Sequence, residues 1–232
     1  QLISLYKTHA RYDIRVNMAI MTTASILYNV GEFDSALLLY RMVLPREELI
    51  SYQEKKMNKI RREIGLPDVK IIISTNEFGR SSTLFLNKGF EEEDSSMLPP
   101  KPEKLMQLEE SVNSLNSLPA YEDDVIFKCG LILANSKRPW ESIYAFDYNY
   151  SINPDSDLGQ RAFAESLFVL LDPLLEYQEI LDRGNEYLKN YNQGLTPRRT
   201  LYAMTLAHQR QTNWYNIKNL KLETNLNYND VN

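Results

Sequence analysis

Apolar residues recur at steps of three and four along much of the chain, which is the spacing of an amphipathic α-helix. Residues 12–44 carry two such stripes, and Gly31 lies between them at a position that favours a helix end. The first stripe comprises Ile14, Met18, Met21, Ile26 and Leu27, and the second comprises Phe33, Ala36, Leu37, Tyr40 and Leu44. The pattern predicts two antiparallel helices joined by a short turn.

A third helix is predicted over residues 46–64, where the apolar stripe is narrower. Its members are Leu49, Gln53, Met57, Ile60 and Ile64. The same segment carries dense positive charge, at Lys55, Lys56, Lys59, Arg61 and Arg62. We expect these basic side chains to form a solvated helix face, with an acidic partner or a lipid head group as the alternative.

Residues 69–89 carry the one strong strand signal of the sequence. Two apolar runs, KIIIST and STLFLN, flank a polar stretch that contains Gly79, and this arrangement predicts a β-hairpin. An edge of such a hairpin could pair with a strand of a partner. The acidic run EEED and the segment SSMLPPKP follow and are typical of a linker. A short helix is expected next, over residues 103–117.

The second half of the chain returns to helix pairs. Gly130 lies within one predicted helix, and Pro139 begins the next, which extends to Ile152. A further pair is predicted over residues 158–171 and 174–191, because apolar positions recur there at helical spacing.

Proline residues suggest two helix starts in this half. Asp172 is placed to act as an N-cap and Pro173 as the first helical residue, where a missing N–H group is tolerated. Pro197 is predicted to begin a last pair, over residues 198–211 and 214–224.

Several residue types recur at matching positions of these pairs. An aromatic residue begins each second helix, at Phe33, Trp140, Tyr177 and Trp214, and the last three are evenly spaced. Small residues occur in first helices and second helices alike, at Ala24, Gly130, Ala36 and Ser142. An aromatic residue follows each of the last two, at Tyr40 and Phe146. Recurrence at a fixed interval indicates a repeat protein in which neighbouring units bury a continuous core.

This pattern resembles the tetratricopeptide repeat (TPR) family, in particular the TPR proteins of the bacterial periplasm and the outer-membrane lipoproteins. The first unit carries the resemblance at Gly31, Phe33, Ala36 and Tyr40. The second unit carries it at Gly130, Ser142, Phe146 and Pro154. Later units match less well, mainly at Tyr177, Tyr187, Tyr202 and Trp214.

The resemblance implies an all-α fold, a right-handed superhelix of helical hairpins interrupted by a β-hairpin insertion. Three regions are expected: 1–64 with one TPR-like unit, 65–102 with the hairpin and linker, and 103–232 with three helix pairs. In the family the concave face is lined by first helices and binds a partner segment. The corresponding candidates here are Tyr28, Phe127, Glu165, Arg199, Tyr202 and Gln209.

Composition narrows the range of partners. The net charge of −5 does not provide the basic surface that nucleic acid requires, so a protein partner is expected. No run of apolar residues reaches the length of a transmembrane helix, although a lipid anchor outside this sequence stays open. Cys129 is the only cysteine and lies in an apolar run. The family resemblance and low cysteine content favour the periplasm or the outer membrane, with the cytoplasm as the alternative.

The motifs of known catalytic sites are absent, and we expect no cofactor and no metal ion. His9 and His208 have no second ligand at helical spacing, which favours structural or surface roles. The Lys-x-x-x-Asn pair of chaperone-binding TPR proteins is also missing at Lys128 and Arg199. The hypothesis is therefore a non-enzymatic protein-binding scaffold in a bacterial envelope assembly. The alternative is a structural subunit of a larger envelope machine, such as a motor or secretion accessory, or a homo-oligomer; an unrecognised helical enzyme is a third reading.

Overall fold

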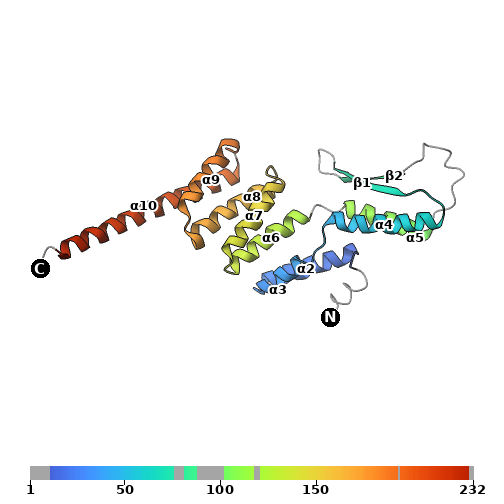
Figure 1. The fold of residues 1–232 in the computed structure, drawn as a ribbon, viewed down its shortest axis with the longest axis horizontal. Helices are drawn as coiled ribbons and strands as arrows, with labels where there is room; N and C mark the ends of the chain where they lie inside the picture. The colour runs from blue at the N-terminus through green and yellow to red at the C-terminus, as the bar shows by residue number, and fades with distance from the viewer. Residues whose placement is uncertain (1–10, 76–80, 88–101, 118–120, 193, 230–232) are drawn as a thin grey trace. The chain divides into compact units, whose positions relative to one another are not determined.

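The computed structural model describes residues 11–75, 81–87, 102–117, 121–192 and 194–229, and the chain in these ranges is mostly helical (Figure 1). Side chains are described for 11–72, 102–115, 121–192 and 194–215. The chain divides into two compact units, Gln1–Val125 and Ile126–Asn232. The predicted hairpin loop and the linker lie outside the described residues.

The first unit begins with the predicted helix pair. Helix α2 spans Ile14–Asn29 and helix α3 spans Phe33–Tyr40, and the two pack against each other. Gly31 between them has a φ of 85°, in the left-handed region that glycine adopts at little cost. The prediction of two helices around a glycine turn is confirmed.

The buried face of α2 differs from the predicted stripe. Its core residues are Val16, Asn17, Ile20 and Ala24, whereas Met18 and Ile26 are exposed. Asn17 is buried because its hydrogen bonds are satisfied: its amide donates to the Leu44 carbonyl at 2.8 Å and accepts from the Leu44 N–H at 3.1 Å. A count of apolar residues gave the wrong face because the true face includes a polar and a small side chain.

Helix α4 spans Arg46–Glu63 and helix α5 spans Glu103–Ser117, and the two pack together. Strands β1, Val69–Thr75, and β2, Ser81–Asn87, pair antiparallel, with Val69 opposite Asn87 and Thr75 opposite Ser81. Helix α5 also packs against β2, so it lies in the first unit, although the sequence grouped it with the later helix pairs. The core shared by these elements includes Leu49, Met57, Val69, Leu105, Val112 and Leu115.

Side chains of α4 hold the outer edge of β1. Asn58 accepts a hydrogen bond from the Val69 N–H at 2.7 Å and donates one to the Val69 carbonyl at 2.9 Å. A carboxylate oxygen of Glu54 accepts from the Ile71 N–H at 3.0 Å. The backbone groups of β1 that face away from β2 at these two positions are therefore already paired.

One of the basic residues of α4 does not belong to a solvated face. Arg61 is only 7% exposed, and its Nε donates to the Pro67 carbonyl at 2.6 Å. The turn that follows α4 folds back over the helix, so that a side chain expected to face water meets a backbone acceptor instead. The neighbouring Arg62 is exposed and pairs with Asp68, as a surface residue would.

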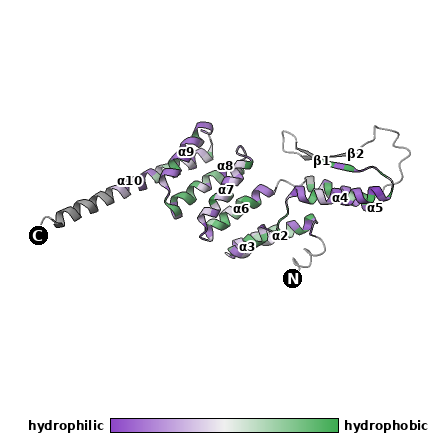
Figure 2. Ribbon diagram, viewed as in Figure 1, coloured by the Kyte–Doolittle hydropathy of each residue, from purple (hydrophilic) through white to green (hydrophobic). Residues whose placement is uncertain are grey.

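The second unit consists of successive helices, and Figure 2 shows hydrophobic residues in α6 and α8. Helix α6, Glu122–Asn135, begins in the first unit and continues into the second. The others are α7, Pro139–Ile152; α8, Asp157–Val169; α9, Tyr177–Asn190; and α10, Leu195–Asn229. Pro139 is the first residue of α7, as predicted.

The predicted start of a helix at Asp172 and Pro173 is wrong. The chain continues from α8 into a single π-helical turn, Leu170–Leu174, and Pro173 lies within this turn. Leu175 then adopts a left-handed conformation, with a φ of 60°, before α9 begins at Tyr177. A wider π-turn accommodates a proline that an α-helix would exclude. The carboxylate of Asp172 pairs with Arg210 at 2.7 Å instead of capping a helix.

The predicted last helix pair is also wrong, because α10 is one continuous helix of 35 residues. Trp214 lies in its interior and does not begin a second helix. The sequence after Pro197 contains neither glycine nor a further proline, the two residue types that interrupt a helix most strongly. The even spacing of aromatic residues therefore does not define a repeat boundary here.

Candidate partner-binding face

Side chains from α6, α8 and α10 lie against one another in series, and we call this set the α6–α8–α10 face. Its members are Phe127, Arg161, Glu165, Phe168, Arg199 and Tyr202. Within α8, the residues of this set are separated by four and three positions, which places them on one side of the helix. The same spacing rule places the two residues of α10 one turn apart.

The contact between α6 and α8 is made by a cation and an aromatic ring. The guanidinium carbon of Arg161 lies 5.0 Å from the centroid of the Phe127 ring. Phe127 is buried, and its other face packs in a tilted arrangement on Phe146 of α7, with 5.6 Å between ring centroids. The ring is therefore fixed in the core while Arg161 itself is exposed.

The contact between α8 and α10 combines an ion pair with a second cation–aromatic contact. Arg199 donates to a carboxylate oxygen of Glu165 at 2.8 Å. Its guanidinium carbon also lies 5.1 Å from the centroid of the Phe168 ring. Both charged side chains are partly buried, so the geometry of this pair is better constrained than that of a freely exposed one.

Tyr202 completes the face on α10. Its ring lies 6.4 Å from that of Phe168, at an interplanar angle of 45°. Tyr202 is 58% exposed, which leaves much of one aromatic side chain open to solvent. Aromatic and arginine side chains with this degree of fixation and exposure are typical of protein-binding surfaces.

Four of the six predicted binding residues belong to this face: Phe127, Glu165, Arg199 and Tyr202. Gln209 lies two turns further along α10 and is exposed. Tyr28 belongs to the first unit, where its ring packs on that of Phe33 with 5.7 Å between centroids.

The predicted repeat residues lie at helix contacts. Gly130 of α6 lies against Phe146 of α7, and a Cβ atom at Gly130 would lie 2.6 Å from a ring carbon of Phe146. Ser142 is fully buried and donates to the Gly130 carbonyl at 2.8 Å. In the first unit Ala36 and Tyr40 are buried. The Pro154 carbonyl accepts from Gln160 at 2.6 Å, in the turn before α8.

Two members of the face, Arg161 and Phe168, were missed by the sequence reasoning. Their separation of three and four positions from Glu165 is a signal that could have found them. A second surface was also missed: a row of exposed residues along α7, formed by Trp140, Tyr144, Tyr148 and Ile152. The interval of four residues along one helix places these side chains in a continuous stripe.

A tyrosine cluster joins the ends of α7, α8 and α9. The Tyr187 hydroxyl donates to Gln160, and the Tyr191 hydroxyl donates to Asp155 at 2.7 Å. Burial raises the pKa of Tyr187 to about 12, and burial also raises the pKa of Tyr150. The hydrogen bond to Asp155 raises the pKa of Tyr191. The hydroxyls of Tyr187 and Tyr191 therefore stay protonated at neutral pH and act as donors.

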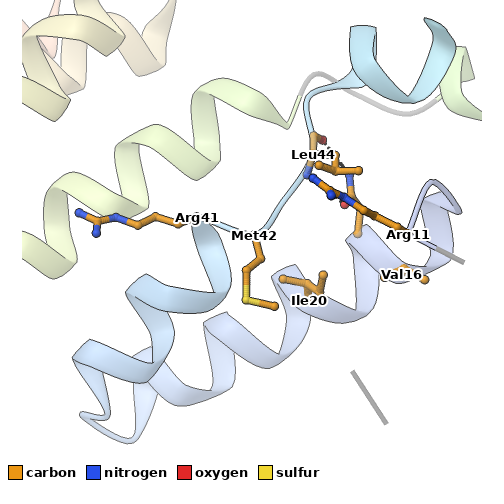
Figure 3. A pocket seen from close by; sticks show the side chains of 7 residues that line it. Arg11, Val16, Ile20, Arg41, Met42 and Leu44 are labelled. Atoms are coloured by element: carbon orange, nitrogen blue, oxygen red, sulfur yellow. Dashed lines mark hydrogen bonds between the residues drawn. The ribbon is translucent and has the colours of Figure 1, made fainter. Parts of the chain in front are cut away.

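A separate pocket of about 340 Å³ lies in the first unit (Figure 3). Its lining residues are Arg11, Val16, Asn17, Ile20, Arg41, Met42 and Leu44. Figure 3 shows Met42 close to Ile20 and Arg41 extending away from them. The polar side chain of Asn17, which lines the pocket, already has hydrogen-bond partners. Its amide donates to the Leu44 carbonyl and, at 3.2 Å, to the Tyr121 hydroxyl. None of the predicted binding residues lines this pocket.

Metal binding finds no support in the described ranges, which hold no group of three or more His, Cys, Asp or Glu residues placed to share an ion. Within the same ranges no helix combines the length and the apolar character needed to cross a bilayer.

No family model matches the chain, and neither a curated protein nor a solved structure matches it. The α6–α8–α10 face and the exposed stripe along α7 are therefore the two features of the structure that bear on function.

Proposed function

We propose that this chain is a non-enzymatic, TPR-like scaffold that binds a segment of a partner protein along the α6–α8–α10 face. The observation that carries the proposal is the series of contacts between alternate helices. Arg161 contacts Phe127 one helix pair earlier, and Glu165 and Phe168 contact α10 one pair later. Such contacts arise when helix pairs stack on their neighbours.

The second layer of helices supports the same arrangement. Arg183 of α9 forms an ion pair with Asp147 of α7, and the rings of Tyr150 and Tyr187 lie 6.4 Å apart. Helices α7 and α9 are thus related in the same way as α6 and α8. On this proposal α6 with α7, and α8 with α9, are repeat units of a right-handed superhelix, and α10 is the first helix of an incomplete third unit.

The chemistry of the face suits a peptide more than a small molecule. Its side chains are spread over three helices, and they include three aromatic rings and two guanidinium groups. Arginine and aromatic residues contribute most of the binding energy in many protein interfaces. In the TPR family the partner lies along first helices, and α6, α8 and α10 hold that position on the proposed assignment. The resemblance to periplasmic and lipoprotein TPR proteins places this binding in a bacterial envelope assembly as part of the proposal.

A random peptide library displayed on phage, selected on the purified chain, tests this function. We expect peptides to be recovered whose binding is lost on Tyr202→Ala and retained on Tyr148→Ala. The two tyrosines make a matched pair, because they are 58% and 60% exposed on different helix layers. Recovery of no peptide, or equal binding to both variants, would contradict the proposal.

A second candidate function, a structural subunit that joins copies of itself, is favoured by the α7 stripe. Trp140, Tyr144, Tyr148 and Ile152 are each about half exposed or more and follow one another along the helix. Exposed aromatic stripes of this kind mark interfaces more often than they remain solvated. Multi-angle light scattering over a range of concentrations tests this candidate. Association that is lost on Tyr144→Glu would support it, and a monomer at every concentration would exclude it.

A further inference from the structure

Arg161 differs from the other charged residues of the α6–α8–α10 face. Glu165 lies one turn after Arg161 on α8 and forms an ion pair of 2.8 Å with Arg199 of α10, so these two charges neutralise each other. Arg161 is exposed and stands over the Phe127 ring, and none of its described neighbours forms an ion pair with it. The face therefore carries one uncompensated positive charge, although the chain as a whole carries a net charge of −5.

The position of Arg161 on the ring prepares it for a carboxylate. Contact with the ring restrains the guanidinium group, while its N–H donors lie in the plane of the group and stay open to a ligand. A carboxylate can accept two of these donors side by side, in the geometry that makes such pairs strong. Because Phe127 is itself fixed against Phe146, little further ordering is needed when the ligand binds.

Tyr202 supplies the complementary apolar contact. Its ring is held on one side by Phe168 and is exposed on the other. Arg199 is engaged by Glu165 and stacked on Phe168, so it is less available than Arg161 to a new anion. The face thus presents a free cation on α8 and an open aromatic ring on α10, with a neutral ion pair between them.

We infer that the occupant of this face is an extended peptide segment with an Asp or Glu side chain bound at Arg161 and an apolar side chain packed on Tyr202. The inference rests on the proposed function and specifies the chemistry of its partner. Charge complementarity selects an acidic segment, because Arg161 would repel a basic one and the Glu165 carboxylate is already engaged by Arg199. An internal side chain, and not a chain terminus, is the source of the carboxylate.

The test uses a random peptide library whose C-termini are fused to the phage coat protein, so that no free terminal carboxylate is present. We expect the pool selected on the wild-type chain to be enriched several-fold in Asp and Glu. We expect the pool selected on Arg161→Gln to lose this enrichment but keep its apolar residues. Arg198→Gln is the matched control, since Arg198 is an exposed arginine on α10 outside the face, and its pool should resemble the wild-type pool.

Fluorescence anisotropy with one selected peptide measures the coupling directly. Replacing its acidic residue by the corresponding amide should weaken binding to the wild-type chain about tenfold or more, and should change binding to Arg161→Gln little. The comparison of the acidic peptide with its amide on the wild-type chain needs no protein variant. This comparison therefore remains informative even if Arg161→Gln folds poorly.

The outcomes separate the two proposals. A selected pool without acidic enrichment, or an amide substitution that weakens binding equally to both proteins, overturns the acidic-segment inference and leaves the peptide-binding function standing. Binding that appears only when a free C-terminus is supplied overturns it as well. If no peptide is recovered, or if Tyr202→Ala binds as the wild type does, the proposed function fails and the inference falls with it.

Discussion

The hydroxyl group of Ser142 donates a hydrogen bond of 2.8 Å to the carbonyl of Gly130, across the contact between α7 and α6. Both residues are buried. A glycine on one helix and a small polar residue on the other allow the two backbones to approach, and the hydroxyl then reaches a backbone oxygen of its neighbour. This contact joins α6 and α7 at a position where their backbones approach closely in the proposed helix pair.

Replacing Ser142 by Ala removes this interhelical hydrogen bond while keeping the side chain small. We expect Ser142→Ala to lower the free energy of unfolding by about 0.5–1.5 kcal/mol. Chemical denaturation provides the measurement. Ser151→Ala, at an exposed position of the same helix, is the control and should change stability by less than about 0.5 kcal/mol. Equal effects at the two serines would mean that the contact does not stabilise the helix pair.

Adding a methyl group at Gly130 should be costly, because its Cβ would lie 2.6 Å from the ring of Phe146. Phe146 is fully buried and cannot move aside without disturbing the core. We expect Gly130→Ala to destabilise the chain by about 1–3 kcal/mol. The double variant with Phe146→Leu, which makes room for the methyl group, should cost less than the sum of the two single variants. Additive effects in this double-mutant cycle would argue against the predicted steric contact.

Arg61 and Arg62 form a matched pair of neighbouring arginines in different surroundings. Arg61 is 7% exposed and bonded to the Pro67 carbonyl, whereas the Arg62 side chain is 70% exposed. We expect Arg61→Gln to lower the free energy of unfolding by about 1–3 kcal/mol, and Arg62→Gln by less than about 1 kcal/mol. Urea denaturation of both variants checks this, and similar midpoints would refute the burial of Arg61.

Alkaline pH should destabilise the fold through its buried tyrosines. Burial raises the pKa of Tyr187 and of Tyr121 to about 12. Between their ordinary pKa near 10 and about 12, the unfolded chain loses these protons while the folded chain keeps them. The stabilising contribution is therefore complete below about pH 10 and is lost as the pH rises towards 12. Urea midpoints measured from pH 8 to pH 11 should fall at the alkaline end, less steeply for Tyr187→Phe, and an unchanged slope in that variant would contradict the assignment.

The continuity of α10 can be tested by a distance between two spin labels. Labels at Thr205→Cys and Thr224→Cys, with Cys129 replaced by Ser, should lie about 28 Å apart if the helix is unbroken, given a rise of about 1.5 Å per residue. A turn near residues 212–213, as the sequence pattern predicted, would bring the labels much closer together. Pulsed electron spin resonance distinguishes the two arrangements, and a distribution centred on the shorter distance would restore the helix pair.

Sequence reasoning succeeded where one residue type sets a backbone boundary. The glycine turn at Gly31 and the proline start of α7 at Pro139 depend on local conformational preferences, which operate regardless of the rest of the fold. It also selected Glu165 and Arg199, which the structure joins in one ion pair. That selection depended on the repeat register, which aligned first helices before any contact was known.

Sequence reasoning failed where tertiary contacts decide which of several locally possible structures a segment adopts. The core face of α2 includes Asn17 because Leu44, far along the chain, supplies both hydrogen-bond partners. Asp172 is a good N-cap by type, but Arg210 on α10 engages its carboxylate. The regular spacing up to Trp214 suggested a further turn, but the segment contains neither glycine nor proline and continues as one helix. For Asn17 and Asp172, the deciding residue lies outside the window in which the pattern was counted.

The hydrogen bonds from Asn58 and Glu54 to the backbone of β1 determine at which edge a further strand could add to this sheet. Because Val69 and Ile71 are already hydrogen-bonded on that side, an incoming strand cannot extend the sheet there without first displacing α4 side chains. We therefore expect an added strand to join at β2. If two copies met by their β2 strands, both remaining edges would be β1 edges, and the assembly would end as a closed pair instead of continuing into a fibre.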